Sequence, residues 1–289
     1  MKKQFLISLA ICLSGSALAQ PIGSSEPQLL IKAEQGLMAP VWSPKGDKIA
    51  VTTNGYYGIL VANADGSNLK QLTDEAGAGY KMSWNAEGTQ ILGRTNVMDG
   101  CFVLHEVKTW DATTGSEQTI VAKTRNIAGT PTWGNLKAKK SAAQASIYET
   151  MVSDPVNATS RIAALSEFAG KMVINPALSP DASTIAFQIP GKGIYTINAD
   201  GSNLKFAIKA NHPAWLPDSK SFVATITTDN GEVITSSDIY AVNVATGNTT
   251  NLTTNTELIP MHPTVSPDGA RVAFENVKDA AIYVINLKY

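Results

Sequence analysis

The chain of 289 residues contains few cysteines, only Cys12 and Cys101. Cys12 lies in a segment that we expect to be removed, so the mature chain would keep Cys101 alone. A framework of intramolecular disulfides is thereby excluded. Cys101 could be a free thiol, an intermolecular link or a buried filler. We favour burial because free cysteines behave as small hydrophobic side chains.

The sequence also lacks an excess of positive charge and, after residue 19, a long apolar run. Without residues 1–19 the chain has 21 basic and 24 acidic residues, a net charge of −3. Such a balance offers no basic face for nucleic acid. We expect no transmembrane helix, because no later apolar run is long enough. Apolar residues also show no long helical period, which argues against an α/β fold.

The N-terminus has the pattern of a secretory signal. Two lysines follow Met1, residues 5–13 are almost wholly apolar, and Ala17-Leu18-Ala19 precedes Gln20. A charged start, a short apolar stretch and a small-residue cleavage site predict that residues 1–19 are removed. We therefore expect cleavage near Ala19-Gln20 and a periplasmic or secreted mature protein.

The octapeptide NADGSNLK occurs twice, at residues 63–70 and 198–205. The two copies lie 135 residues apart, which is three times a plausible repeat length of about 45 residues. A shared binding task and a shared structural position are the two explanations. Asp65 and Asp200 resemble calcium ligands, but one carboxylate per segment is too few. Asp-Gly between apolar runs favours a hairpin turn instead.

A second motif recurs at steps of 37 to 50 residues. It consists of a proline, a short apolar stretch, a Ser-Pro-Asp-Gly-like turn and a second apolar stretch. Its six copies begin at or near Pro40, Ser83, Pro131, Pro176, Pro213 and Pro263. Proline fixes φ for a turn, and Asp and Gly tolerate a left-handed corner, so each copy predicts a hairpin. A third strand, exemplified by IYTI at 194–197, then leads to the Asp-Gly turn.

Four antiparallel strands repeated every 40 to 50 residues predict blades of a β-propeller. We therefore expect an all-β, six-bladed propeller of four-stranded blades over residues 20–289. The third unit, about 130–174, lacks both turn motifs, so it is either a diverged blade or a blade with a surface insertion. The last unit supplies three strands only. Residues 28–32 should close the ring by pairing as its outer strand.

The turn motif and the segment IYxINADGSNL resemble the WD40-like (PD40) repeats of TolB-type propellers. The resemblance covers about residues 38–289. It implies a periplasmic module that binds envelope proteins through its propeller. Similar repeats accompany serine peptidase domains and form oligogalacturonate lyases. Only about 18 residues precede the first blade, no α/β domain precedes the propeller, and no G-x-S-x-G motif is present. The chain has three histidines, whereas the lyases hold a metal with a histidine cluster.

The residue before each inner-strand proline is the position where the units differ most. Histidine occupies it in two adjacent units, as His212 and His262, and the other units have Ala39, Lys81, Thr130 and Asn175. This position should lie at a rim of the central channel. The two histidines could bind a divalent metal there, with Asn175 as a third ligand. The alternative is that His-Pro merely begins a strand.

Four tryptophans, Trp42, Trp84, Trp133 and Trp215, recur at or next to one inner-strand site. Aromatic residues at a repeated site favour a core between blades over a platform for sugars. No paired carboxylates or phosphate-binding glycine loop can be recognised.

We favour a non-catalytic binding module that presents its channel-mouth loops to an envelope protein or peptide, and we expect it to be a monomer. Its ligand-binding candidates are Lys81, Thr130, Asn175, His212 and His262, and no cofactor is required. The alternative is a carbohydrate-active enzyme similar to oligogalacturonate lyase, with a metal at the channel mouth.

Overall fold

The computed structural model describes residues 20–125, 171–254 and 256–289. The predicted signal, residues 1–19, lies outside the described residues, as do Thr130, Trp133 and most of the third repeat unit. Within the described part, no helix has the length and apolar character needed to cross a membrane.

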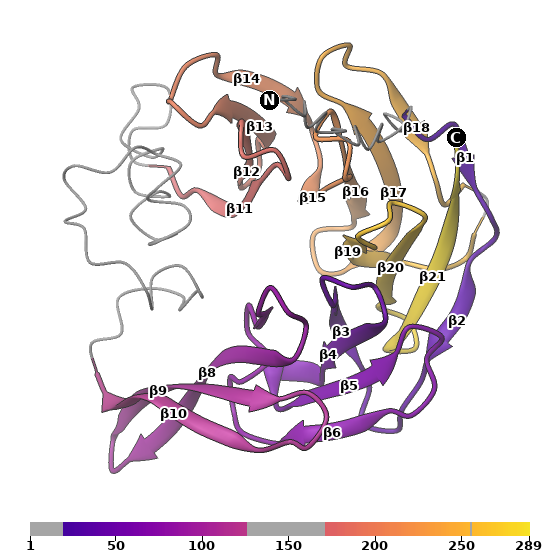
Figure 1. The fold of residues 1–289 in the computed structure, drawn as a ribbon. Coiled ribbons are helices and arrows are strands. Elements are labelled where there is room, and N and C mark those ends of the chain that lie inside the picture. The colour runs from indigo at the N-terminus through magenta and orange to yellow at the C-terminus, as the bar shows by residue number, and fades with distance from the viewer. Residues whose placement is uncertain (1–19, 126–170, 255) are drawn as a thin grey trace, which may run out of the picture.

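The described residues form five antiparallel sheets arranged around a centre like the blades of a propeller (Figure 1). The first blade consists of β3 (Met38–Trp42), β4 (Lys48–Thr52), β5 (Ile59–Asn63) and β6 (Lys70–Thr73), with the short 3-10 helix η1 (Asn54–Tyr56) after β4. The second consists of β7 (Ser83–Trp84), β8 (Gln90–Asp99), β9 (Phe102–Asp111) and β10 (Glu117–Thr124). In each, the strands pair in chain order.

The remaining three blades follow the same plan. The third consists of β11 (Ile174–Leu178), β12 (Thr184–Ile189), β13 (Gly193–Asn198) and β14 (Lys205–Ile208). The fourth consists of β15 (Asn211–Trp215), β16 (Ser221–Asp229), β17 (Ile234–Asn243) and β18 (Thr249–Asn251). The last combines β19 (Pro260–Val265), β20 (Arg271–Asn276) and β21 (Ala281–Lys288) with β1 (Gly23–Ser24) and β2 (Gln28–Ile31).

The all-β propeller is confirmed, but the prediction of six blades is wrong, because the described residues form five. The sixth was counted on the unit at about 130–174, which carries neither turn motif. Motif spacing counts units of chain, and most of this unit, residues 130–170, lies outside the described residues. The pairing that the structure describes yields five sheets, and the end of that unit, from Ile174, belongs to β11 of the third blade.

The predicted closure by the N-terminal segment is confirmed. β2 pairs antiparallel with β21, with Gln28 opposite Val284 and Leu29 opposite Tyr283. β1 pairs with the far end of the same strand, so the last sheet has five strands instead of four. Figure 1 shows these indigo strands beside the yellow β21. The two ends of the described chain therefore join within one blade.

Both predicted turns form. In the first blade, the Ser43 N–H donates to the Lys48 carbonyl at 2.9 Å and closes the hairpin between β3 and β4. In the repeated octapeptide, the N–H and hydroxyl of Ser67 donate to the Asp65 carboxylate at 2.9 and 2.6 Å. Ser202 and Asp200 repeat these bonds at 2.8 and 2.6 Å. The duplication therefore serves a turn.

Those turn hydrogen bonds also favour the ionised form of the two aspartates. The bonds from serine lower the pKa of the Asp65 and Asp200 carboxyls, because they stabilise the ionised form. The carboxylate oxygen Oδ1 of each is thus committed to its own turn.

The tryptophans lie between blades, as predicted for the described ones. Trp42, Trp84 and Trp215 are buried. Trp84 Nε1 donates to the Val41 carbonyl of the preceding blade at 3.1 Å, and Trp215 Nε1 donates to the Ala177 carbonyl at 2.9 Å. The indoles of Trp84 and Trp215 therefore pack apolar surface and fix the distance to the neighbouring inner strand.

The interpretation of Cys101 as buried is wrong. It is exposed at the tip of the long hairpin between β8 and β9. The hairpin extends beyond the region where neighbouring blades cover it, and Met98 and Phe102 beside the tip are exposed too. The apolar character of a free cysteine favoured burial of Cys101, but the two long strands β8 and β9 place it at an exposed hairpin tip.

The octapeptide turn of the first blade should be more sensitive to substitution than the matching turn of the fourth. Gly66 has φ +84°, and an added Cβ would lie 2.0 Å from the carbonyl oxygen of Leu30 in β2. Gly247 has φ +74° in a similar turn with nothing within 4 Å. Gly247→Ala should lower the free energy of unfolding by about 1–2 kcal/mol, the cost of left-handed backbone. Gly66→Ala should lose about 1–3 kcal/mol more through overpacking.

Urea unfolding of both variants, followed by tryptophan fluorescence, measures this difference. Equal losses would show that the turn does not press on the closing strand.

Candidate functional site

Each of the five blades begins with a residue in the left-handed backbone region. The φ angles are positive at Ala39 (49°), Lys81 (52°), Asn175 (50°), His212 (55°) and His262 (47°). These are the positions that the sequence analysis singled out at the start of the inner strand, and a proline follows each of them except Lys81, which precedes Met82. Residues other than glycine seldom adopt positive φ, so the recurrence of positive φ at the same position in every blade indicates a specific structural role.

The left-handed residue produces a β-bulge. In the first, third, fourth and last blades, the register between the inner strand and its neighbour shifts at this point. One shift falls between Asn211 and Ala214, around His212, and another between Met261 and Thr264, around His262. A bulge re-aims the side chain of the extra residue, here toward the centre of the ring.

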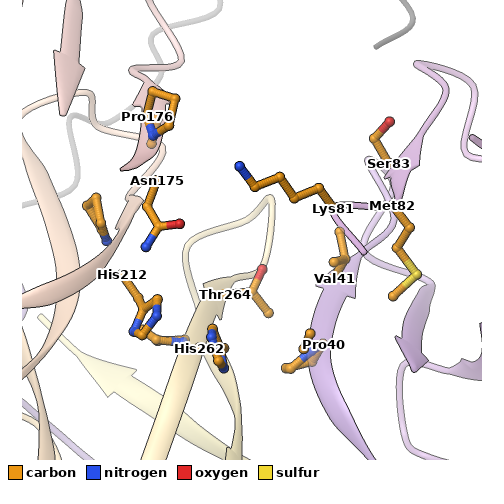
Figure 2. Close-up of a pocket in the computed structure, with 14 residues that line it drawn as sticks. Pro40, Val41, Lys81, Met82, Ser83, Asn175, Pro176, His212, His262 and Thr264 are labelled. Carbon is orange, nitrogen blue, oxygen red and sulfur yellow. The ribbon is translucent and has the colours of Figure 1, made fainter. Parts of the chain in front are cut away.

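All five left-handed residues line one cavity of about 420 Å³. Its other walls are formed by the prolines and apolar residues that follow them, and by Ser83 and Thr264. An adjoining cavity of about 380 Å³ shares all five residues and adds the rings of Tyr56 and Tyr80. The structure therefore brings His212, His262, Asn175 and Lys81 together around one space (Figure 2).

The two histidines lie side by side. Their ring centroids are 4.1 Å apart and the rings are tilted by 54°. His262 Nδ1 is 2.9 Å from Oε1 of Glu275, whose side chain is 10% exposed. The other carboxylate oxygen of Glu275 accepts the N–H of Ala39 at 2.6 Å. One buried carboxylate thus orients the imidazole and links the last blade to the first.

His212 is held neutral. Its Nδ1 lies 3.4 Å from the Thr225 hydroxyl. Burial, followed by the neighbouring His262 ring, lowers the pKa of His212 to about 3. Because Nδ1 of each ring has a partner, the hydrogen-bond network leaves both Nε2 atoms for the cavity.

Asn175 completes this side of the cavity. Its Nδ2 donates to Oε1 of the buried Gln188 at 3.0 Å. The same Gln188 oxygen accepts the N–H of His212 in the next blade at 3.3 Å. The amide oxygen of Asn175 is not used in that bond, which leaves it as an acceptor.

Lys81 lies on the opposite side, and it is exposed. Its Nζ is 5.5 Å from the centroid of the Tyr80 ring, and Arg94 Cζ is 5.9 Å from the same centroid. Tyr80 meets Tyr56 edge-on at 5.1 Å. Burial, and then the charge of Glu275, raises the pKa of Tyr56, so this hydroxyl stays protonated.

The sequence comparison missed the second member of each pair. Every left-handed residue is followed, thirteen positions later, by the fifth residue of the second strand, namely Thr52, Arg94, Gln188, Thr225 and Glu275. Three of these pairs are in polar contact: Asn175 with Gln188, His212 with Thr225 and His262 with Glu275. The constant spacing is the signal that could have found them.

A ready-made metal cluster is absent from the part of the chain that the structure describes. No group of three or more His, Cys, Asp or Glu side chains there is arranged to hold an ion. A metal at His212 and His262 would need Asn175 or another ligand.

Comparisons with known proteins support the fold alone. No protein-family model and no curated protein matches the chain. A chain of the mitotic checkpoint complex is 12% identical, with 100% of this chain and 99% of that one covered and a TM-score of 0.56. The β-propeller domain of Cps50 (Swd1) from Myceliophteria thermophila is 10% identical, with 92% and 99% covered and a TM-score of 0.54.

TolB from Acinetobacter baumannii is 14% identical, with 91% of this chain covered and a TM-score of 0.38. The chain spans 57% of the length of that TolB chain. Together the strand pairing and the two higher-scoring likenesses define a β-propeller protein. Membership of the TolB-like repeat family stays a prediction from the sequence motifs.

His212 should not titrate near neutrality. In ¹³C–¹H spectra from about pH 8 to about pH 4.5, its Cε1–H resonance should stay flat, because its pKa lies near 3. His212→Gln identifies the resonance. Since the folded pKa is below the ordinary value of 6.5, stability is full above that value and falls as the pH drops below it.

The loss should reach up to about 1.4 kcal/mol per pH unit in that window, and His212→Gln should remove it. An inflection of the His212 resonance between about pH 6 and 7 would contradict the neutral, buried assignment.

Proposed function

We propose that the protein is a non-catalytic binding module whose central cavity receives an extended segment of a protein or peptide. One observation carries this proposal. A single backbone position, left-handed in every blade, directs a methyl, an ammonium, an amide and two imidazoles into one cavity. A purely structural position would favour one residue type, whereas a recognition surface needs several.

The form of the cavity supports a segment of chain as the ligand. Two adjoining cavities of about 420 and 380 Å³ share their central residues, so the space is large enough for several side chains of a peptide. Its walls combine prolines and Val41 with a few polar groups, a mixture that suits alternating apolar and polar side chains. The predicted signal at residues 1–19 favours a partner in the periplasm or outside the cell.

A charge placed in the cavity should prevent partner binding. Thr264 lines the cavity from β19 and points into it (Figure 2). Thr249, exposed on the outer strand β18, is the matched control. Affinity capture from envelope extract should recover one partner with the wild type and Thr249→Arg. Thr264→Arg should recover about tenfold less, since the guanidinium fills the space and must be desolvated.

Circular dichroism must show that both variants fold. Capture of no partner by the wild type, or full capture by folded Thr264→Arg, would refute the proposal.

A second candidate is a carbohydrate-active enzyme that uses a divalent metal. The observation in its favour is the histidine pair. Histidines that bind metals commonly use one ring nitrogen for the metal and donate the other N–H to a carboxylate or similar group. His262 has that arrangement with Glu275, and His212 has a weaker version with Thr225. Asn175 could supply a third ligand, which would leave a position open.

Calorimetric titration with Zn²⁺ or Mn²⁺ tests this candidate. If it is correct, the wild type should bind one ion, and the double variant His212→Ala, His262→Ala should lose binding. His105→Ala, which removes the histidine bonded to Asn96 away from the cavity, should bind normally. Polyuronide cleavage should then appear only with metal. Absence of binding, or equal binding by the double variant, would eliminate the candidate.

A further inference from the structure

The second blade breaks a rule that the other blades obey. Wherever the left-handed residue has a polar side chain, its partner thirteen positions later is complementary: amide with amide, imidazole with hydroxyl, imidazole with carboxylate. In the first blade the left-handed residue is Ala39, which needs no partner. In the second blade the two positions hold Lys81 and Arg94, which carry the same charge.

This like-charged pair is not neutralised in the part of the chain that the structure describes. The ion pairs found there join Lys108 to Glu75, Glu106 and Glu117, and His262 to Glu275, and none includes Lys81 or Arg94. Both cations lie within 6 Å of one ring centroid, that of Tyr80. Because Lys81 and Arg94 have the same charge, neither can neutralise the other.

The carboxylate of the cavity wall, Glu275, has its contacts elsewhere. One oxygen lies against His262 and the other accepts the Ala39 N–H, and neither forms an ion pair with Lys81 or Arg94. Tyr56, which carries a protonated hydroxyl, lies beside Tyr80. The wall at Lys81 therefore carries a positive charge for which no ion-pair partner is found among the described residues.

We propose that the Lys81–Arg94 corner binds a carboxylate on the partner, specifically an acidic side chain of an extended peptide; this inference rests on the function proposed above. Lys81 lines both cavities and extends toward Asn175, so its ammonium would contact the carboxylate directly (Figure 2). Arg94 lines neither cavity and acts as a positioning residue that adds charge from beyond the Tyr80 ring.

Peptide chemistry fits this corner better than a free anion. The cationic wall continues into apolar surface formed by Met82 and the prolines, such as Pro176. An acidic side chain brings methylenes and a backbone that can lie on that surface, while its carboxylate reaches Lys81. A small inorganic anion would use the charge alone.

The test uses hexaglutamate as the probe and hexaglutamine as its neutral counterpart, with calorimetry on the whole chain. Hexaglutamate should bind the wild type and hexaglutamine should not. Lys81→Gln should weaken binding about tenfold and Arg94→Gln about threefold, since one contacts the carboxylate and the other acts at a distance. Lys205→Gln, which removes an exposed cation from the outer strand β14, should change nothing.

Two further readouts separate recognition from a structural role. Hexaglutamate affinity should fall as NaCl rises from about 50 to about 300 mM. The melting temperatures of Lys81→Gln and Arg94→Gln should stay equal to that of the wild type or rise, because each change removes a repulsion. A fall in melting temperature together with lost binding would indicate a structural role and overturn the inference.

The remaining outcomes are equally decisive. Equal affinity for the two peptides, no binding of hexaglutamate, or unaltered binding by Lys81→Gln would overturn the inference. Tighter binding of trigalacturonate than of hexaglutamate would show that the Lys81–Arg94 corner recognises an acidic sugar, and would overturn the proposal of a peptide ligand. If an envelope partner is lost with Thr264→Arg but kept by Lys81→Gln, the binding module stands and only the carboxylate inference fails.

Discussion

The N–H group of the left-handed residue at the start of each inner strand is the constraint on which the centre of this propeller depends. A bulged strand cannot satisfy that donor within its own ladder, and a buried, unpaired N–H is costly. At two junctions the preceding blade supplies the acceptor: Glu275 for Ala39 at 2.6 Å and Gln188 for His212 at 3.3 Å. At these two junctions the residue that faces the cavity is therefore positioned by a bond between blades.

The junction that closes the ring is held in a different way. In the second and fourth blades an indole N–H donates to the inner strand before it. Trp42 occupies the same site in the first blade, yet its buried Nε1 finds no acceptor among the described residues. Arg271 of the last blade lies over the Trp42 ring at 4.5 Å instead, and its Nη1 donates to the Ala64 carbonyl at 3.0 Å. A cation over an aromatic face thus replaces the repeated hydrogen bond.

The local strand pattern could be predicted because turns are local. Asp65 bonds to a residue two positions away, and Ser43 closes a hairpin of six residues, so short motifs specify both. The number of blades could not, because it depends on which strands pair. The equivalence of His212 and His262 followed from alignment of the units. Their contact with each other, and the role of Glu275, arise only when blades meet, and no motif of a few residues spans that distance.

The same backbone device explains why the cavity can be specific while the fold stays unchanged. A left-handed residue other than glycine costs about 1–2 kcal/mol, and this cost hardly depends on which side chain is present. In the first and fourth blades the bulge, the following proline and the bond from the neighbouring blade fix the direction of the side chain, not its chemistry. The five positions can therefore carry a methyl, an ammonium, an amide or an imidazole without altering the sheet. The like charges of Lys81 and Arg94 are tolerated because strand pairing elsewhere in the sheet supplies the stability.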